Sequence, residues 1–107
     1  IASRTGERIE FIELSRISHF FSEDKLTFAA TPERNYVVDQ TIVELERRLE
    51  SRGFFRIHRA TLVKLSAVRE LHTWFGGRLV VRLDDHARTE LIVARDRVKL
   101  LKERLGA

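Results

Sequence analysis

The sequence is most informative from Phe54 to Lys64, where it reads FFRIHRATLVK and contains no acid. Phe55 and Ile57 share one parity of this segment, whereas Arg56 and His58 share the other. In an extended strand, successive side chains point to opposite faces, so one face would enter a core and the other would present cations. Cations on an ordered backbone can neutralise phosphates or contact base edges. A second interpretation stays open, in which the histidine is hydrogen-bonded inside the fold and the arginines are simply solvated.

The basic charge of the chain is concentrated around this segment. The 107 residues include 20 Lys or Arg and 16 Asp or Glu. Residues 51–83 hold seven cations and one acid, Glu70, whereas the rest of the chain holds thirteen cations and fifteen acids. A local excess of positive charge is compatible with a polyanionic partner. It is also typical of a solvated face, so charge alone does not identify the partner.

Hydrophobic periodicity predicts β-strands over most of the chain. Apolar and polar residues alternate, and turn residues such as Pro32 and the pair Gly76-Gly77 separate the alternating segments. Residues 26–38 are predicted to form a hairpin, whereas residues 54–63 are apolar but mixed in pattern. The predicted strands are residues 8–14, 18–22, 26–30, 36–38, 68–74, 78–83 and 89–93.

Two segments have the period of an α-helix instead. Thr41 and Glu44 form a capping box, in which the threonine hydroxyl satisfies a free backbone N–H, and apolar residues follow at helical spacing over about 42–51. A second, basic helix is predicted over 95–105. The two helices are not adjacent, so no helix-turn-helix is expected. Strands and helices do not alternate regularly either, so the pattern favours a mainly β, mostly antiparallel fold.

The residues that most enzymes and metal sites require are missing or scattered. There is no Cys, so neither a disulfide nor a cysteine metal site is possible. The four histidines have no metal-ligand spacing, and no nucleophile or phosphate-loop motif occurs. Asp84-Asp85 lies in a turn, where Asp is common. We therefore expect no enzyme activity, no cofactor and no metal. No apolar run is long enough to span a membrane, and we expect a cytoplasmic protein without membrane contact.

Four segments resemble the LytTR DNA-binding domains of bacterial response regulators, the LytR/AlgR family. The segment at 54–64 resembles the family signature F-x-R-I-H-R-S-Y-L-V-N. Residues 17–21 resemble its early I-x-F-F/I-E segment, and residues 36–46 resemble its Y-x-V-x-x-T-L-x-E-L-E entry to a helix. Residues 91–95, LIVAR, resemble its L-x-V-S-R segment. The resemblance covers roughly residues 8–105.

The resemblance implies an elongated antiparallel β arrangement with one short central helix and a C-terminal helix. It also implies sequence-specific binding of double-stranded DNA, by loops that enter successive major grooves, in the output domain of a transcription regulator of a two-component system. Tandem repeats are the expected DNA sites. We expect residues 8–107 to form this domain and residues 1–7 to be the remnant of a linker from a receiver or other sensor domain.

The family's DNA contacts can be carried over residue by residue. Arg59 and Arg95 match base-contacting positions, and Arg is well suited to bridge the O6 and N7 acceptors of guanine. Lys25 lies in a loop that matches a third contact. For His58, which lies in the motif, a structural role and a DNA contact both stay open. The residues expected to hold the DNA backbone are Arg56, Lys64, Arg97 and Lys99.

The sequence also departs from the family pattern. Ala60, Thr61 and Lys64 replace the Ser, the aromatic residue and the Asn of the signature, and Ala94 replaces the later Ser. These changes put the particular DNA sequence in doubt more than DNA binding itself.

Two other functions are compatible with the sequence. Trp74 and Phe75 could stack on the bases of RNA or single-stranded DNA, although packing in the core or within a hairpin is the better explanation for them. The chain could also be a protein-interaction module without a nucleic-acid ligand.

Overall fold

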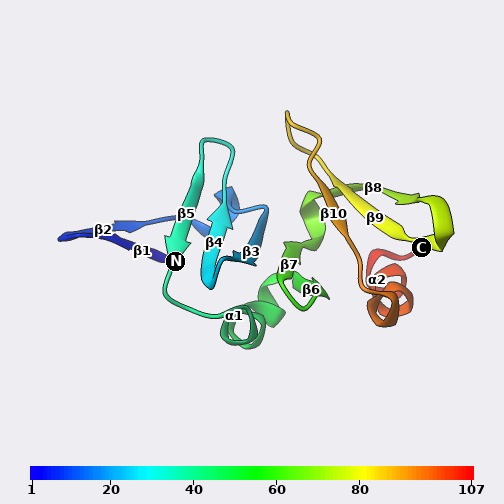
Figure 1. Ribbon diagram of the computed structural model, residues 1–107, viewed down its shortest axis with the longest axis horizontal. Helices are drawn as coiled ribbons and strands as arrows, with labels where there is room; N and C mark the ends of the chain where they lie inside the picture. The colour runs from blue at the N-terminus through cyan, green and yellow to red at the C-terminus, as the bar shows by residue number, and fades with distance from the viewer.

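The computed structural model describes all 107 residues, which form three antiparallel β-sheets and two α-helices. The molecule measures 46 × 28 × 26 Å along its principal axes and is visibly elongated (Figure 1). The prediction of a mainly β, elongated antiparallel fold with a short central helix and a C-terminal helix is confirmed. No helix has the length and the apolar character that crossing a membrane would require.

A five-stranded sheet occupies the centre of the molecule, with the strand order β5-β4-β3-β7-β6. All neighbouring strands are antiparallel, and β3 joins the two hairpins by pairing with β7. The five strands are β3 (His19–Glu23), β4 (Leu26–Ala30), β5 (Asn35–Val38), β6 (Phe54–His58) and β7 (Thr61–Lys64).

Helix α1 (Ile42–Leu49) connects β5 to β6 and begins at the predicted capping box. The Glu44 backbone N–H donates to the Thr41 hydroxyl at 3.1 Å, and the Thr41 N–H donates to the Glu44 carboxylate at 2.9 Å. Ile42, Leu45 and Leu49 are buried, as the apolar spacing predicts.

Two smaller sheets extend the molecule at its ends (Figure 1). At one end, β1 (Ala2–Thr5) pairs with β2 (Arg8–Phe11). Toward the other end, β8 (Val68–Thr73), β9 (Leu79–Leu83) and β10 (Glu90–Ile92) form a sheet with the order β10-β9-β8. Helix α2 (Val98–Leu105) follows β10 and ends the chain.

The apolar residues form two separate cores. The core beneath α1 contains Ile12, Ile17, Phe20, Ala29, Val38, Ile42, Leu45, Leu49, Phe54 and Leu62. The core shared with α2 and the three-stranded sheet contains Phe55, Ile57, Val63, Leu79, Val81, Leu83, Val93 and Leu101. The β6–β7 hairpin contributes to both cores, because alternate residues of each strand point to opposite faces.

The structure differs from the predicted elements in several places. The strand predicted at 8–14 ends at Phe11, and the helix predicted at about 42–51 ends at Leu49. Residues 54–63 form most of the β6–β7 hairpin. Their pattern predicts no strand boundaries, because both faces of the hairpin are buried and apolar residues do not alternate with polar ones. The C-terminal helix begins at Val98 and not at Arg95, since residues 95–97 form a 3₁₀ turn. Residues 2–5, for which no strand is predicted, form β1 and pair with β2.

His19 is the one titratable side chain that is buried in the fold, with 6% of its surface exposed. Its ring stacks on Phe21 at 5.6 Å between centroids, and its Nδ1 lies 2.8 Å from the Ser18 hydroxyl. Burial lowers the pKa of the imidazole to about 4, an effect that the charge of Asp85 opposes.

The fold should therefore lose stability as the pH falls from about 6.5 toward about 4. In this window the unfolded chain binds a proton at His19 that the folded chain excludes, which costs roughly 3 kcal/mol once complete. Urea unfolding at pH 7, 6 and 5 should show this loss, and His19→Leu should reduce it. An equally steep loss in the variant would assign the pH dependence to other groups.

Candidate nucleic-acid interface

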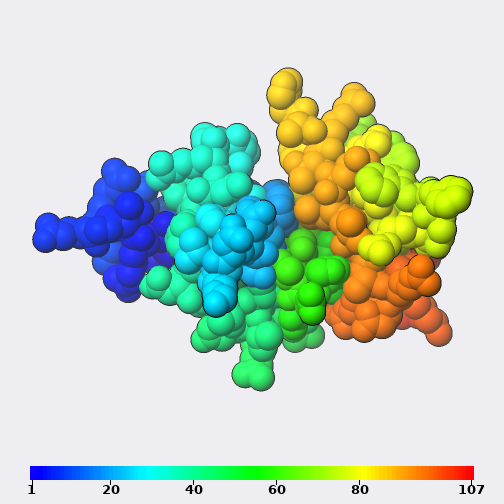
Figure 2. Space-filling view, in the orientation of Figure 1, coloured from blue at the N-terminus to red at the C-terminus, as the bar shows by residue number.

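Three chain segments meet along one edge of the molecule. The β3–β4 turn and the β6–β7 turn lie at the same end of the five-stranded sheet, since Phe21 pairs with Thr61 and the Ser22 N–H donates to the Ala60 carbonyl at 2.9 Å. The third segment is the connection between β10 and α2. The three follow one another from left to right across the lower half of Figure 1, and Figure 2 shows the green surface of β6 and β7 between cyan and orange neighbours. This edge brings Lys25, Arg59 and Arg95 to one side.

The β6–β7 turn holds the backbone of Arg59 firmly while its side chain stays exposed. The Arg56 guanidinium donates to the Arg59 carbonyl at 2.7 Å. The Ala60 N–H donates to Nδ1 of His58 at 3.2 Å. His58 therefore has a structural role in shaping this turn, and Arg56 acts as a brace as well as a cation.

The segment before α2 is fixed to the same hairpin. The Ala94 N–H donates to the Ile57 carbonyl at 2.8 Å, and Nε of Arg97 donates to the Arg56 carbonyl at 2.8 Å. The Arg97 guanidinium also lies 4.8 Å from the centre of the Phe55 ring. The side chain of Arg97 is thus used within the protein, whereas Arg95 between these anchors is exposed.

A hollow of about 490 Å³ separates the β6–β7 turn from the segment before α2. Glu46 of α1 lies in this hollow, 3.4 Å from Arg56 and 4.0 Å from Arg97. The Glu46 carboxylate therefore contacts two arginines from different segments, Arg56 of β6 and Arg97 of the segment before α2. Sequence reasoning missed Glu46, because nothing local in the chain shows which distant arginines it meets. The residues that line the hollow are Glu46, Arg56, His58, Arg59, Ala94, Asp96 and Arg97.

The β3–β4 turn carries its lysine in a strained backbone conformation. Asp24 and Lys25 have φ of 51° and 66°, the positive values required at both central residues of a type I′ hairpin turn. Glycine or asparagine usually occupies such positions, because a Cβ is disfavoured there by about 1 kcal/mol. Lys25 therefore presents an exposed cation at a position where its backbone is unfavourable.

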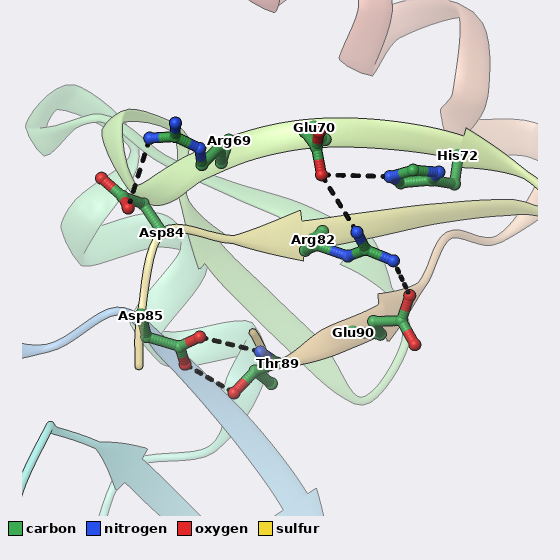
Figure 3. A network of polar contacts seen from close by, with 8 residues as sticks. All are labelled: Arg69, Glu70, His72, Arg82, Asp84, Asp85, Thr89 and Glu90. Atoms are coloured by element: carbon green, nitrogen blue, oxygen red, sulfur yellow. Dashed lines mark hydrogen bonds and ion pairs between the residues drawn. The ribbon is translucent and has the colours of Figure 1, made fainter. Parts of the chain in front are cut away.

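The exposed cations of this edge have no acidic partners. Lys25, Arg59, Arg95 and Lys99 form no ion pair within 4.0 Å, whereas several arginines elsewhere do. Figure 3 shows one such paired group, in which Arg82 lies between Glu70 and Glu90 at 3.2 and 3.0 Å. The four exposed cations of this edge are therefore available to an anion outside the protein, although exposed arginines without an ion pair also occur elsewhere, as at Arg52 and Arg88.

Lys64 is not brought to this edge. It lies at the end of the hairpin opposite Arg59, where β7 pairs with Phe54. Its ammonium donates to the Leu14 and Ser15 carbonyls at 2.9 and 3.1 Å, and burial lowers its pKa. The expectation that Lys64 holds a phosphate is therefore not supported by its position, because the side chain connects the hairpin to residues 14 and 15. No cluster of three or more His, Cys, Asp or Glu side chains is arranged to hold a metal.

Comparison with known proteins identifies the family. The family model of the LytTr DNA-binding domain matches residues 7–106. The chain belongs to the LytTR DNA-binding family. It is a non-catalytic DNA-binding domain of the kind found in bacterial transcriptional regulators.

Relatives of this LytTR domain include several bacterial regulators. The transcriptional regulatory protein YpdB of Escherichia coli K12 is 33% identical over 97 residues, which cover 91% of this chain and 39% of YpdB. The sensory transduction protein LytT of Bacillus subtilis is 28% identical over 105 residues, which cover 98% of this chain and 43% of LytT. The chain thus spans about two fifths of the length of these relatives.

A solved structure has the same fold. The LytTr DNA-binding domain of a response regulator from Bacillus cereus superposes with a TM-score of 0.86 over 100% of this chain and 96% of that one. The sequences are 17% identical. This likeness shows that the fold of the LytTR domain is shared despite extensive sequence change.

The contacts at this edge predict that Arg97 and Arg95 differ in their effects on stability. Arg97→Ala should lower the free energy of unfolding by about 1–2 kcal/mol, because it removes a hydrogen bond to the Arg56 carbonyl. Arg95→Ala should change it by less than about 0.5 kcal/mol, because that side chain is exposed. Urea unfolding of both variants measures the difference. Equal losses would contradict the division between bracing and exposed arginines.

Proposed function

We propose that this LytTR domain reads a specific duplex DNA sequence with the three segments of its unpaired basic edge. In this proposal, loops of this edge enter successive major grooves, where the Arg59 and Arg95 side chains reach base edges. The observation that carries the proposal is the arrangement of exposed, unpaired cations on turns whose backbones are braced. Base recognition requires side chains that are free to reach the DNA from a fixed backbone.

The dimensions of the molecule support this docking. Successive major grooves on one face of B-DNA lie one helical turn apart, about 34–36 Å. The long axis of 46 Å exceeds this distance, and the three segments follow one another along it (Figure 1). The domain as a whole is therefore longer than the distance between successive major grooves.

The exposed and bracing residues would have different roles on DNA. Arg59 and Arg95 would contact guanine, and Lys25 would contact a base from the β3–β4 turn. Lys99 would neutralise a phosphate. Arg56, Arg97 and His58 would hold the contacting segments in place, with the two arginines adding positive charge near the backbone.

The domain would act as part of a larger regulator. Its relatives are more than twice as long as this chain, which supports fusion to a receiver or other sensor domain. We propose that this regulator works in the bacterial cytoplasm and occupies tandem DNA repeats.

Arg59→Ala should weaken binding to the preferred duplex by about 1–3 kcal/mol and relax the preference at one base pair. The preferred duplex is found by selection from a random pool, and affinities are then measured by titration. Arg52→Ala is the matched control, because Arg52 is an exposed arginine without an ion pair at the opposite end of β6. Equal losses on every sequence would make Arg59 a phosphate contact. Unchanged affinity would contradict the proposed interface.

Lys25→Gly should separate stability from DNA binding. Glycine relieves the positive φ of 66°, so the free energy of unfolding should rise by about 1 kcal/mol. The affinity for DNA should nevertheless fall, because the cation is lost. Asp24→Gly is the control, since it relieves the adjacent φ of 51° and keeps the lysine. A Lys25→Gly variant that binds DNA as tightly as the parent would exclude this turn from the interface.

A further inference from the structure

The β8–β9 turn carries an aromatic side chain that the fold does not use. Phe75 is fully exposed and Trp74 is 46% exposed, so neither packs as a hairpin residue normally would. The turn is nevertheless ordered by hydrogen bonds, in which the Trp74 N–H donates to the Arg78 carbonyl at 2.6 Å and the Gly77 N–H donates to the Trp74 carbonyl at 3.1 Å. Two adjacent exposed aromatic side chains on an ordered turn form a candidate contact surface.

This turn continues the basic edge beyond Arg95. The Val93 N–H donates to the Leu79 carbonyl at 3.0 Å, which places the start of β9 beside the end of β10. The β8–β9 turn immediately precedes Leu79, and Arg95 follows Val93 by two residues. Both therefore lie at the same end of the three-stranded sheet, and the turn lies toward the end of the long axis in Figure 1.

The charges along β9 also change toward this end. Arg82, farther along β9, is neutralised by glutamates from both neighbouring strands (Figure 3). Arg78 is exposed and forms no ion pair within 4.0 Å. Arg78, which immediately precedes β9, is thus an exposed cation without an ion pair at the end of the sheet nearest Arg95, and such a cation can neutralise a phosphate.

We propose that the β8–β9 turn is a fourth DNA-contacting element, which binds the sugar–phosphate backbone flanking the site beyond the base pair that Arg95 reads. Arg78 neutralises a phosphate there, and Phe75 packs on the apolar face of a deoxyribose. The inference rests on the proposed docking of the basic edge. Duplex DNA is the occupant that the observations favour, because the turn is continuous with that edge and carries an unpaired cation.

Two duplexes test the proposal: one ends at the base pair read by Arg95, and the other continues for several base pairs. The 107-residue chain should bind the longer duplex more tightly. Arg78→Ala and Phe75→Ser should each weaken binding to the longer duplex by about 3- to 10-fold, the effect of one lost contact, and leave binding to the shorter one unchanged. Arg78→Ala should also lower the slope of log affinity against log salt by about 0.9.

The controls are a matched aromatic and a matched arginine. Phe11→Ser removes an 80% exposed phenylalanine from β2, which lies at the other end of the molecule. Arg88→Asn removes an exposed arginine from the turn between β9 and β10, and asparagine tolerates its φ of 51°. Neither control should alter the preference for the longer duplex, and thermal unfolding should confirm that all four variants are folded.

Three results would overturn the proposal. Equal affinity of the parent chain for both duplexes would remove any flanking contact. Variants that bind one site normally but lose cooperativity on two repeats would assign the turn to a neighbouring copy. Stronger competition by single-stranded DNA that depends on Phe75 would assign it to base stacking. Arg59→Ala is also measured on the shorter duplex, where a loss of affinity would support the proposed function even when this inference fails.

Discussion

Burial of both faces of the β6–β7 hairpin is the constraint on which the rest of the structure depends. Phe54 and Phe55 are neighbours in sequence, yet they enter different cores. The hairpin therefore lies between the two cores. Helix α1 packs on one of its faces, and α2 packs with the three-stranded sheet on the other. Replacing a large buried side chain of this hairpin by alanine typically lowers the free energy of unfolding by about 2–5 kcal/mol, so the position of the hairpin is strongly specified. The turn that carries Arg59 connects these two strands, so its backbone is held in place by them.

The arginines of the basic edge fall into two groups, one that holds the backbone in place and one that is exposed to solvent. Arg56 and Arg97 are partly buried, share one carboxylate and donate to backbone carbonyls, so they fix the geometry of the segments. Arg59 and Arg95 lie beside them in sequence and are exposed. A partly buried cation that is hydrogen-bonded resists displacement, whereas an exposed one is free to exchange water for a base edge. Arginines close in sequence can thus differ in function because of their burial.

The sequence predicts local features of this domain better than its long-range contacts. The capping box at Thr41 and Glu44 is recognisable because both partners lie within one turn of helix. The hairpin at 54–64 was harder to divide into strands, since burial on both faces removes the simple alternation of apolar and polar residues. Lys64 resembles a phosphate contact in the sequence, but its ammonium is held by carbonyls some 50 positions earlier in the chain. The family motif could locate Arg59 and Arg95, whereas Glu46 and the strained backbone of Lys25 required the folded structure.

The elongated shape has a consequence for how neighbouring repeats can be occupied together. In the proposed docking, the 46 Å axis runs along the DNA, which advances only about 34–36 Å in one helical turn. Two copies in the same orientation on the same face would collide if their sites were one turn apart. Simultaneous occupancy would require centres two turns apart, about 20–21 base pairs. Two repeats closer than this could not be occupied at the same time, so the length of the domain would set the minimum spacing between repeats in an operator.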